Sequence, residues 1–126
     1  MGSATKPRVR VRYRVAAVGM ALASLVVMAG PSQSGTSTIK ATGNDTWSPG
    51  KISVAKGSKV VWKNSSDERH NLTAYKGSWS KSSDLPEGSK TSFKFSKAGS
   101  YKFRCTLHSR MDGSKCDGMC GSVSVR

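Results

Sequence analysis

The segment Cys105-Thr-Leu-His108 offers a thiolate and an imidazole from one short loop at the end of a predicted strand. Two methionines, Met111 and Met119, follow it. Thiolate, imidazole and thioether are the soft ligands that copper prefers, and a trigonal copper site needs one further imidazole. His70 is the other histidine of the chain. These residue types therefore predict a copper centre with two histidines and one cysteine in the plane and a methionine as a weak axial ligand.

The first 29 residues have the composition of a secretory signal peptide. Five Lys and Arg lie between Lys6 and Arg14 without an acidic residue, and apolar or small residues fill the segment 15–30. A basic start, an apolar core and a small-residue exit are typical of an export signal. We expect cleavage after Ala29 and an exported protein, whether secreted, periplasmic or associated with the cell surface. The alternative is an uncleaved membrane anchor, although a membrane span takes about 20 apolar residues.

Basic residues dominate the charge of the chain. Its 21 Lys and Arg stand against seven Asp and Glu, for a net charge of +14. Residues 30–126 keep sixteen of those basic residues and all seven acids, so their net charge is near +9. This charge favours a redox partner with an acidic docking surface, or contact with an anionic membrane or envelope surface. The alternative, to which we give equal weight, is that the lysines only solvate the strands and protect the sheet edges. We expect a monomer. We expect no nucleic-acid partner, because nucleic acid is a poor fit for a protein that is expected to be exported.

The chain beyond the signal segment has room for one small domain. Residues 30–37 are expected to form a flexible linker, and residues 38–126 to form the domain. Short alternating runs between turn residues predict an all-β fold, and a single helical turn could lie at 78–84. Seven to eight short antiparallel strands in under 100 residues fit a Greek-key two-sheet β-sandwich. We expect strands near residues 38–41, 51–55, 59–63, 70–74, 91–95, 99–105 and 121–125.

Alternation predicts which side of each strand is buried. Tyr101, Phe103 and Cys105 fall on one face of their strand, with Lys102 and Arg104 on the other. The thiol is therefore at the end of an inward-facing row. A structural cysteine would also fit there, so burial alone does not assign its role.

From about residue 39 to the end, the chain resembles the plastocyanin-like cupredoxins, the family of blue, type 1 copper proteins. The resemblance implies a cupredoxin fold and His70, Cys105, His108 and a methionine as copper ligands. It also implies that Asn64 ties the loop before His70 to the loop that carries the thiolate. The motifs that carry it are Trp47-Ser-Pro49, Val60-Val-Trp-Lys-Asn64, His70-Asn71, Gly99-Ser-Tyr-Lys-Phe-Arg-Cys105 and Met119-Cys-Gly-Ser-Val-Ser-Val125.

The axial methionine is the point at which the chain departs from this family. Relatives place it two to five residues after the second histidine, whereas ten residues separate His108 from Met119. Met111 has the spacing found in amicyanin. Met119, however, leads into Gly-x-Val-x-Val, the pattern that normally follows the axial ligand. We therefore favour Met119, with Met111 as the alternative.

Cys116 and Cys120 lie in the same inserted segment. In an oxidising compartment, two cysteines four positions apart are expected to pair with each other, which leaves Cys105 as the free thiol for a metal. Two alternatives stay open. Cys105, His108 and both inserted cysteines could form a Cys3His zinc site. Cys105 could instead form a disulfide with Cys116 or Cys120 in a purely structural sandwich.

The sequence favours an electron carrier with one copper ion that cycles between Cu(I) and Cu(II). The alternative is a copper-binding module for capture, delivery or buffering without fast electron transfer. We find no paired carboxylates, Ser-His-Asp set or phosphate-binding glycine loop, so an enzyme is not expected.

Overall fold

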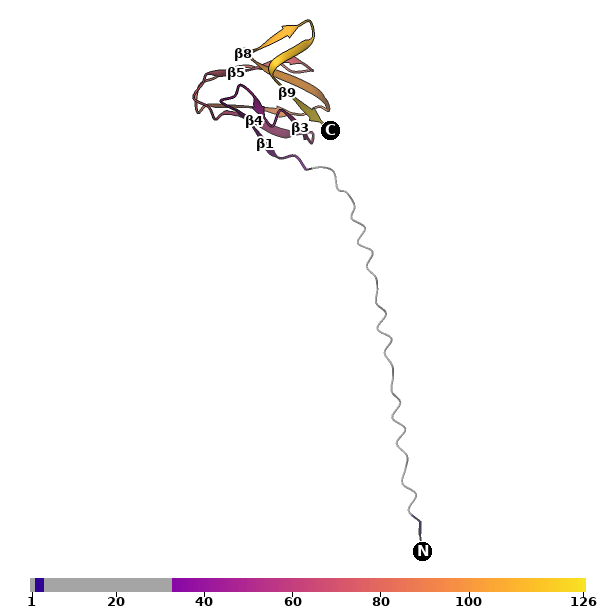
Figure 1. Cartoon of the computed structure of the whole chain (residues 1–126). Coiled ribbons are helices and arrows are strands. Elements are labelled where there is room, and N and C mark those ends of the chain that lie inside the picture. The colour runs from indigo at the N-terminus through magenta and orange to yellow at the C-terminus, as the bar shows by residue number, and fades with distance from the viewer. Residues whose placement is uncertain (1, 4–32) are drawn as a thin grey trace.

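The computed structural model describes residues 2–3 and 33–126, so the predicted signal peptide lies almost wholly outside the described residues. Two β-sheets face each other, with β1 and β4 in one layer and β5 and β8 in the other (Figure 1). The four-stranded sheet has the order β2(Trp47–Ser48), β1(Thr36–Ala41), β4(Ser58–Asn64), β7(Lys90–Phe95). The five-stranded sheet has the order β3(Lys51–Val54), β9(Lys115–Val125), β8(Gly99–Asp112), β5(His70–Lys76), β6(Ser82–Leu85). No helix within the described residues is long and apolar enough to cross a membrane.

The core forms where the inward rows of the two sheets meet. Strand β4 alternates regularly between buried and less buried positions, and its Trp62 is fully buried. Trp62 packs edge-on against Phe103 of the opposite sheet, with ring centroids 5.3 Å apart. Burying each such side chain stabilises the fold by about 2–3 kcal/mol. The inward row of β8 that was predicted from alternation is confirmed, because Tyr101, Phe103 and Cys105 are all buried.

The all-β Greek-key sandwich predicted from the sequence is confirmed, but the sheets are mixed and not purely antiparallel. Strand β1 runs parallel to β4, and β3 runs parallel to β9. Between β1 and β4 the chain leaves the first sheet, contributes β3 to the second and returns. A connection of this length allows a parallel return, whereas the tight turns that were expected give antiparallel pairs.

The structure adds two short strands and an earlier start of β1 to the predicted elements. Strand β1 begins at Thr36, inside the predicted linker, because its first residues pair with Lys59 and Val60 of β4. Strand β2 has only two residues, too few for a pattern to reveal. Strand β6, Ser82–Leu85, occupies part of the segment where a helical turn was considered. It is polar in sequence, and its pairing with β5 decides its conformation.

The largest difference lies after the predicted metal loop. Strand β8 continues to Asp112, and β9 starts at Lys115, so the inserted segment is a β-hairpin that extends both strands (Figure 1). Gly113 lies in its two-residue turn with φ of 59°, a conformation that glycine adopts without strain. The disulfide expected in this inserted segment therefore lies between paired strands and not in an open loop.

Candidate metal centre

His70, Cys105 and His108 meet between strands β5 and β8. The two strands pair in antiparallel register, with Thr73 opposite Arg104. This register brings the first residue of β5 beside the predicted ligand loop of β8. The Cys105 Sγ lies 3.8 Å from His70 Nδ1 and 3.5 Å from His108 Nδ1, and the two Nδ1 atoms are 3.2 Å apart. One soft sulfur and two imidazole nitrogens therefore converge on one point.

A bulge in the β8–β9 ladder presents the ligand loop. Arg104 pairs with Cys120 and Ser109 pairs with Gly118, so residues 105–108 on β8 face the single residue Met119 on β9. The Ser109 hydroxyl closes the bulge by donating to the Cys105 carbonyl at 2.5 Å and accepting from Arg104 Nη1 at 3.0 Å. The loop that carries Cys105 and His108 is thus held on both sides by paired strand.

Met119 lies opposite this bulge and is buried, with 1% of its surface exposed. Gly118 allows β9 to pass this close, because its φ is 102° and a Cβ there would collide with the His108 carbonyl oxygen. Trp47 fixes the backbone of Met119 through a buried hydrogen bond from Nε1 to the Met119 carbonyl, 3.2 Å long. Of the two candidate axial residues, Met119 therefore has the position that faces the ligand loop.

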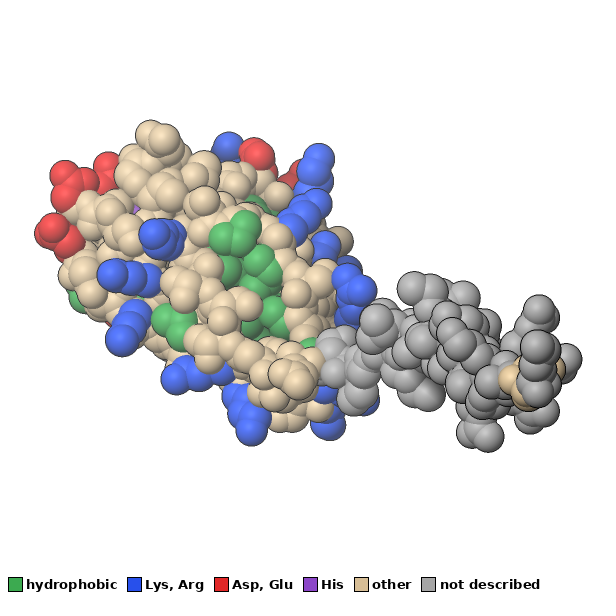
Figure 2. Space-filling view, turned by 90° about the horizontal axis from the view of Figure 1, so that it is seen from below, with side chains coloured by type: hydrophobic (Ala, Val, Ile, Leu, Met, Phe, Trp, Pro, Cys, Tyr) green, Lys and Arg blue, Asp and Glu red, His purple; other side chains and the backbone are tan. Residues whose placement is uncertain are grey.

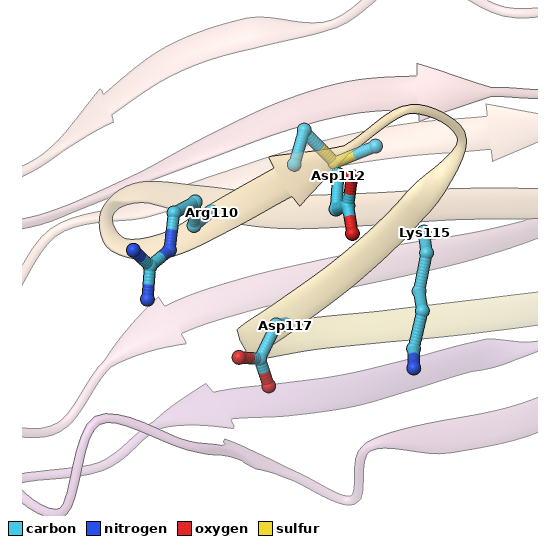
Figure 3. Close-up of a pocket in the computed structure, with 5 residues that line it drawn as sticks. Arg110, Asp112, Lys115 and Asp117 are labelled. Atoms are coloured by element: carbon cyan, nitrogen blue, oxygen red, sulfur yellow. The ribbon is translucent and has the colours of Figure 1, made fainter.

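Met111 has a different environment. It pairs with Cys116 within the hairpin, beyond the bulge and away from Met119. It is only partly buried and lines a groove of about 480 Å³ together with charged side chains of both hairpin strands (Figure 3). The charged residues of this groove are Arg110, Asp112, Lys115 and Asp117.

Cys116 and Cys120 form the predicted disulfide, with Cα atoms 6.2 Å apart. The bond spans Met119 and joins the extended part of the hairpin to the part beside Arg104. Cys105 is a free, buried thiol. Because the other two cysteines are bonded to each other, they are not available for a Cys3His zinc site or for a disulfide with Cys105.

The thiol is held by residues of β5. The backbone N–H of Asn71 donates to Cys105 Sγ at 3.4 Å. The Asn71 side chain also makes two hydrogen bonds with Thr106, the next residue of the ligand loop. Its Nδ2 donates to the Thr106 hydroxyl oxygen at 2.6 Å, and its Oδ1 accepts from the Thr106 backbone N–H at 2.9 Å. A donor to the sulfur stabilises the thiolate, and the two side-chain bonds fix the loop that carries it.

Asn64 has a different role from the one expected. Its Nδ2 donates to the carbonyls of Glu68 and Leu85, at 2.6 and 2.8 Å, and its Oδ1 accepts from Ser66. These bonds order the loop before His70 and connect it to β6. The tie to the thiolate-bearing loop, which was expected of Asn64, is made by Asn71. The sequence cannot separate the two because both asparagines adjoin the loop between β4 and β5.

The Nε2 atoms of the two histidines have different environments. His70 is fully buried, and its Nε2 lies 3.0 Å from Ser66 Oγ. Burial, together with the neighbouring His108, lowers the pKa of His70 below its ordinary value and so favours the neutral imidazole that a metal requires.

His108 lies at the edge of the site, and 24% of its side chain is exposed. Its Nε2 lies 3.4 Å from Asp45 Oδ1 and 3.7 Å from Glu68 Oε2. A side-chain hydrogen bond with Asp45, and the repulsion between the two carboxylates, raise the pKa of Glu68. Both acids and Ser66 were missed from the sequence, because no motif marks them: Asp45 comes from the loop between β1 and β2, whereas Ser66 and Glu68 come from the loop between β4 and β5. The only signal was that the loop before His70 is rich in polar residues.

Comparison with known proteins agrees with this geometry. Residues 15–114 match the cupredoxin-like domain family. No curated protein matches the chain. A small sandwich with a buried thiol between two imidazoles is the architecture of a type 1 copper protein. The chain belongs to the cupredoxin-like domain family.

Solved structures share the fold at low sequence identity. A purple cupredoxin from Nitrosopumilus maritimus has a TM-score of 0.59 at 22% identity, over 71% of this chain and 99% of that one. A reduced amicyanin variant has a TM-score of 0.58 at 22% identity, over 71% and 80% of the two chains. A copper-containing nitrite reductase from Thermus scotoductus SA-01 also has a TM-score of 0.58 at 22% identity, but only 22% of its length is covered.

Proposed function

We propose that this protein binds one copper ion through His70, Cys105, His108 and Met119 and carries single electrons. The observation that carries the proposal is the convergence of the Cys105 Sγ and two histidine Nδ1 atoms, all within 4.8 Å of one another, in a buried setting. The similarity to amicyanin and a purple cupredoxin supports it.

The donor set fits copper. When bound, copper would supply a one-electron couple between Cu(I) and Cu(II), with a potential set by the axial ligand and the apolar shell. The residues around the site serve to keep the ligands still. Cys105 is held by Asn71, the bulge is closed by Ser109, and Met119 is fixed by Trp47. A rigid site limits rearrangement between the two oxidation states, which favours electron transfer.

His108 is the proposed point of electron entry and exit, because it is the ligand with an exposed edge. This edge is acidic, because Asp45 and Glu68 lie beside the Nε2 atom of His108. Figure 2 shows a group of acidic side chains at one end of the visible face, with Lys and Arg side chains spread along its other edges. The net positive charge favours an acidic partner, but Asp45 and Glu68 favour basic groups at the contact itself. We therefore propose a redox partner with basic groups facing His108.

Charged small oxidants test this electrostatic assignment. We expect added salt to slow the oxidation of the Cu(I) protein by a cationic cobalt(III) phenanthroline complex. Added salt should raise the rate of oxidation by hexacyanoferrate(III) or leave that rate nearly unchanged. Replacing Asp45 by Asn and Glu68 by Gln should weaken the salt dependence with the cation. If the anionic oxidant shows the stronger attraction, the net charge of the domain controls the encounter and the acidic-edge assignment is wrong.

The non-enzymatic role and the location also belong to this proposal. The match to the nitrite reductase covers one part of that enzyme, so it supports a shared domain and not a shared reaction. We propose an exported monomer that acts outside the cytosol, supported by the signal-like residues 1–29 and by the Cys116–Cys120 disulfide.

The decisive experiment is the visible spectrum of the copper-loaded protein. We expect an intense thiolate-to-copper charge-transfer band that Cys105→Ser abolishes and that Met111→Leu, the matched control, retains. A copper-loaded protein without this band would contradict the proposed site. Copper capture without electron transfer is the second candidate, and a slow electron self-exchange rate in a protein that has the band would favour it.

A further inference from the structure

We infer that Ser66, held by Asn64, sets the tautomer of His70 and so keeps its Nδ1 free to bind the metal. This inference rests on the proposed function, because it concerns how the chain prepares one ligand of that site. Asn64 ends β4, Ser66 lies in the connection that follows, and His70 begins β5; the three form a hydrogen-bonded series. Ser66 is a positioning residue, since it acts on the metal only through His70.

The direction of each hydrogen bond follows from the Asn64 amide. Its nitrogen lies 2.6 Å from the Glu68 carbonyl and 2.8 Å from the Leu85 carbonyl. Carbonyl oxygens only accept, so this side of the amide must be the NH₂ group. The amide oxygen therefore faces Ser66, where it accepts from the backbone N–H at 2.9 Å and from Oγ at 2.7 Å.

The serine hydroxyl has one proton, and the short bond to Asn64 Oδ1 uses it. A second possible acceptor, the Glu68 carbonyl, lies farther away, at 3.3 Å. At His70 Nε2, 3.0 Å away, Ser66 Oγ can then only accept. His70 therefore carries its proton on Nε2, and its Nδ1 presents a lone pair toward Cys105 and His108.

Without the hydroxyl, the balance shifts toward the opposite tautomer. The buried Nε2–H would lose its Ser66 acceptor, and the Thr42 backbone would be the other hydrogen-bond partner left to the His70 ring. A proton on Nδ1 would instead have acceptors nearby, because His108 Nδ1 lies 3.2 Å away and Cys105 Sγ 3.8 Å away. That tautomer places the proton where the metal must bind. Partners of this kind typically change metal affinity by roughly 10- to 100-fold.

The test reads the tautomer directly in the metal-free protein by ¹⁵N NMR of the imidazole nitrogens at a pH where His70 is neutral. We expect the wild-type His70 to be protonated at Nε2, and Ser66→Ala to shift the population toward Nδ1–H. Ser66→Thr, which keeps the hydroxyl, should restore the wild-type spectrum. Ser65→Ala is the matched control, because Ser65 is exposed and adjacent. A wild-type His70 protonated at Nδ1, or a Ser66→Ala variant that keeps the wild-type tautomer, would overturn the inference.

Copper(I) affinity gives the second measurement. It should fall roughly 10- to 100-fold in Ser66→Ala and remain unchanged in Ser65→Ala. Equal affinity in both variants would count against the positioning role. The two proposals fail separately, because a protein that binds no copper still has a measurable His70 tautomer. If Ser66→Ala does not fold, the wild-type spectrum alone still decides whether the proton is on Nε2.

Discussion

Trp47 donates its indole N–H to the backbone carbonyl of Met119 at 3.2 Å, across 72 positions of the sequence. The two residues come from different sheets and both are buried. An edge-on contact between Trp47 and Phe103, with ring centroids 5.4 Å apart, fixes the indole itself. The bond therefore connects the four-stranded sheet to the position that faces the ligand loop.

The first prediction follows for the axial ligand. Met119→Leu should raise the reduction potential and alter the visible spectrum, because removal of a sulfur donor favours Cu(I). The nearly equal side-chain volumes should keep the loss of unfolding free energy below about 1.5 kcal/mol. Met111→Leu should leave both the potential and the spectrum unchanged. The reverse result from cyclic voltammetry of the pair would assign Met111 as the ligand.

The second prediction concerns Asn71. Asn71→Ala removes two side-chain hydrogen bonds to Thr106 but retains the backbone donor to Cys105. We expect a loss of about 1–3 kcal/mol in unfolding free energy and a shifted charge-transfer band, since the loop carrying the thiolate is less well held. Asn44→Ala, in an exposed turn, provides the control for urea unfolding. An unchanged band with normal stability would show that Thr106 needs no such support.

The third prediction concerns the disulfide. A double Cys116→Ala and Cys120→Ala variant should lose about 2 kcal/mol of unfolding free energy on the chain-entropy estimate for so small a ring. The loss should be larger in the metal-free protein, because a bound metal holds Met119 by a second route. Urea unfolding of both forms measures this difference. Equal losses with and without copper would mean that the disulfide does not help to position Met119.

The fourth prediction is a pH dependence of the metal-free protein. Burial lowers the pKa of His70 below the ordinary value of 6.5, so the unfolded chain binds this proton more readily than the folded one. Stability should therefore be complete above about pH 6.5 and decrease as the pH falls below it. Urea unfolding at pH 8 and pH 5.5 tests this, with His70→Gln expected to show a smaller decrease. If the unfolding free energy instead rises as the pH falls from 8 to 5.5, the assignment of this pH dependence to His70 is wrong.

The sequence was sufficient for the fold class and for the residues that form the centre. The inward row ending at Cys105 could be predicted from alternation. Cys105, His108 and His70 could be predicted from the one thiolate and two imidazoles that a trigonal copper site requires. Both depend on local pattern or on residue type, which a sequence displays directly. The structure brings these residues together, and their role as copper ligands stays a prediction that the spectrum tests.

What the sequence did not reveal depends on contacts between distant segments. The hairpin beyond His108 was missed because polar residues such as Arg110 and Lys115 alternate with few apolar ones, so strand periodicity is weak. The parallel pairing of β1 with β4 follows from the path of the chain between sheets. Asp45 and Ser66 reach the histidines from separate loops, and only three-dimensional geometry identifies them.

The hairpin also affects the order in which the site can assemble. Cys105, His108 and Met119 lie on its two strands, so a short two-residue turn brings three of the four proposed ligands together. Hairpins of this kind form in about 1–10 μs, because the loop to be closed is small. His70 is separated from Cys105 by 35 residues, so its arrival requires the long-range docking of β5. We therefore expect a folding chain to hold a partial, three-ligand site before the sandwich closes, which would let copper bind early and promote the remaining steps.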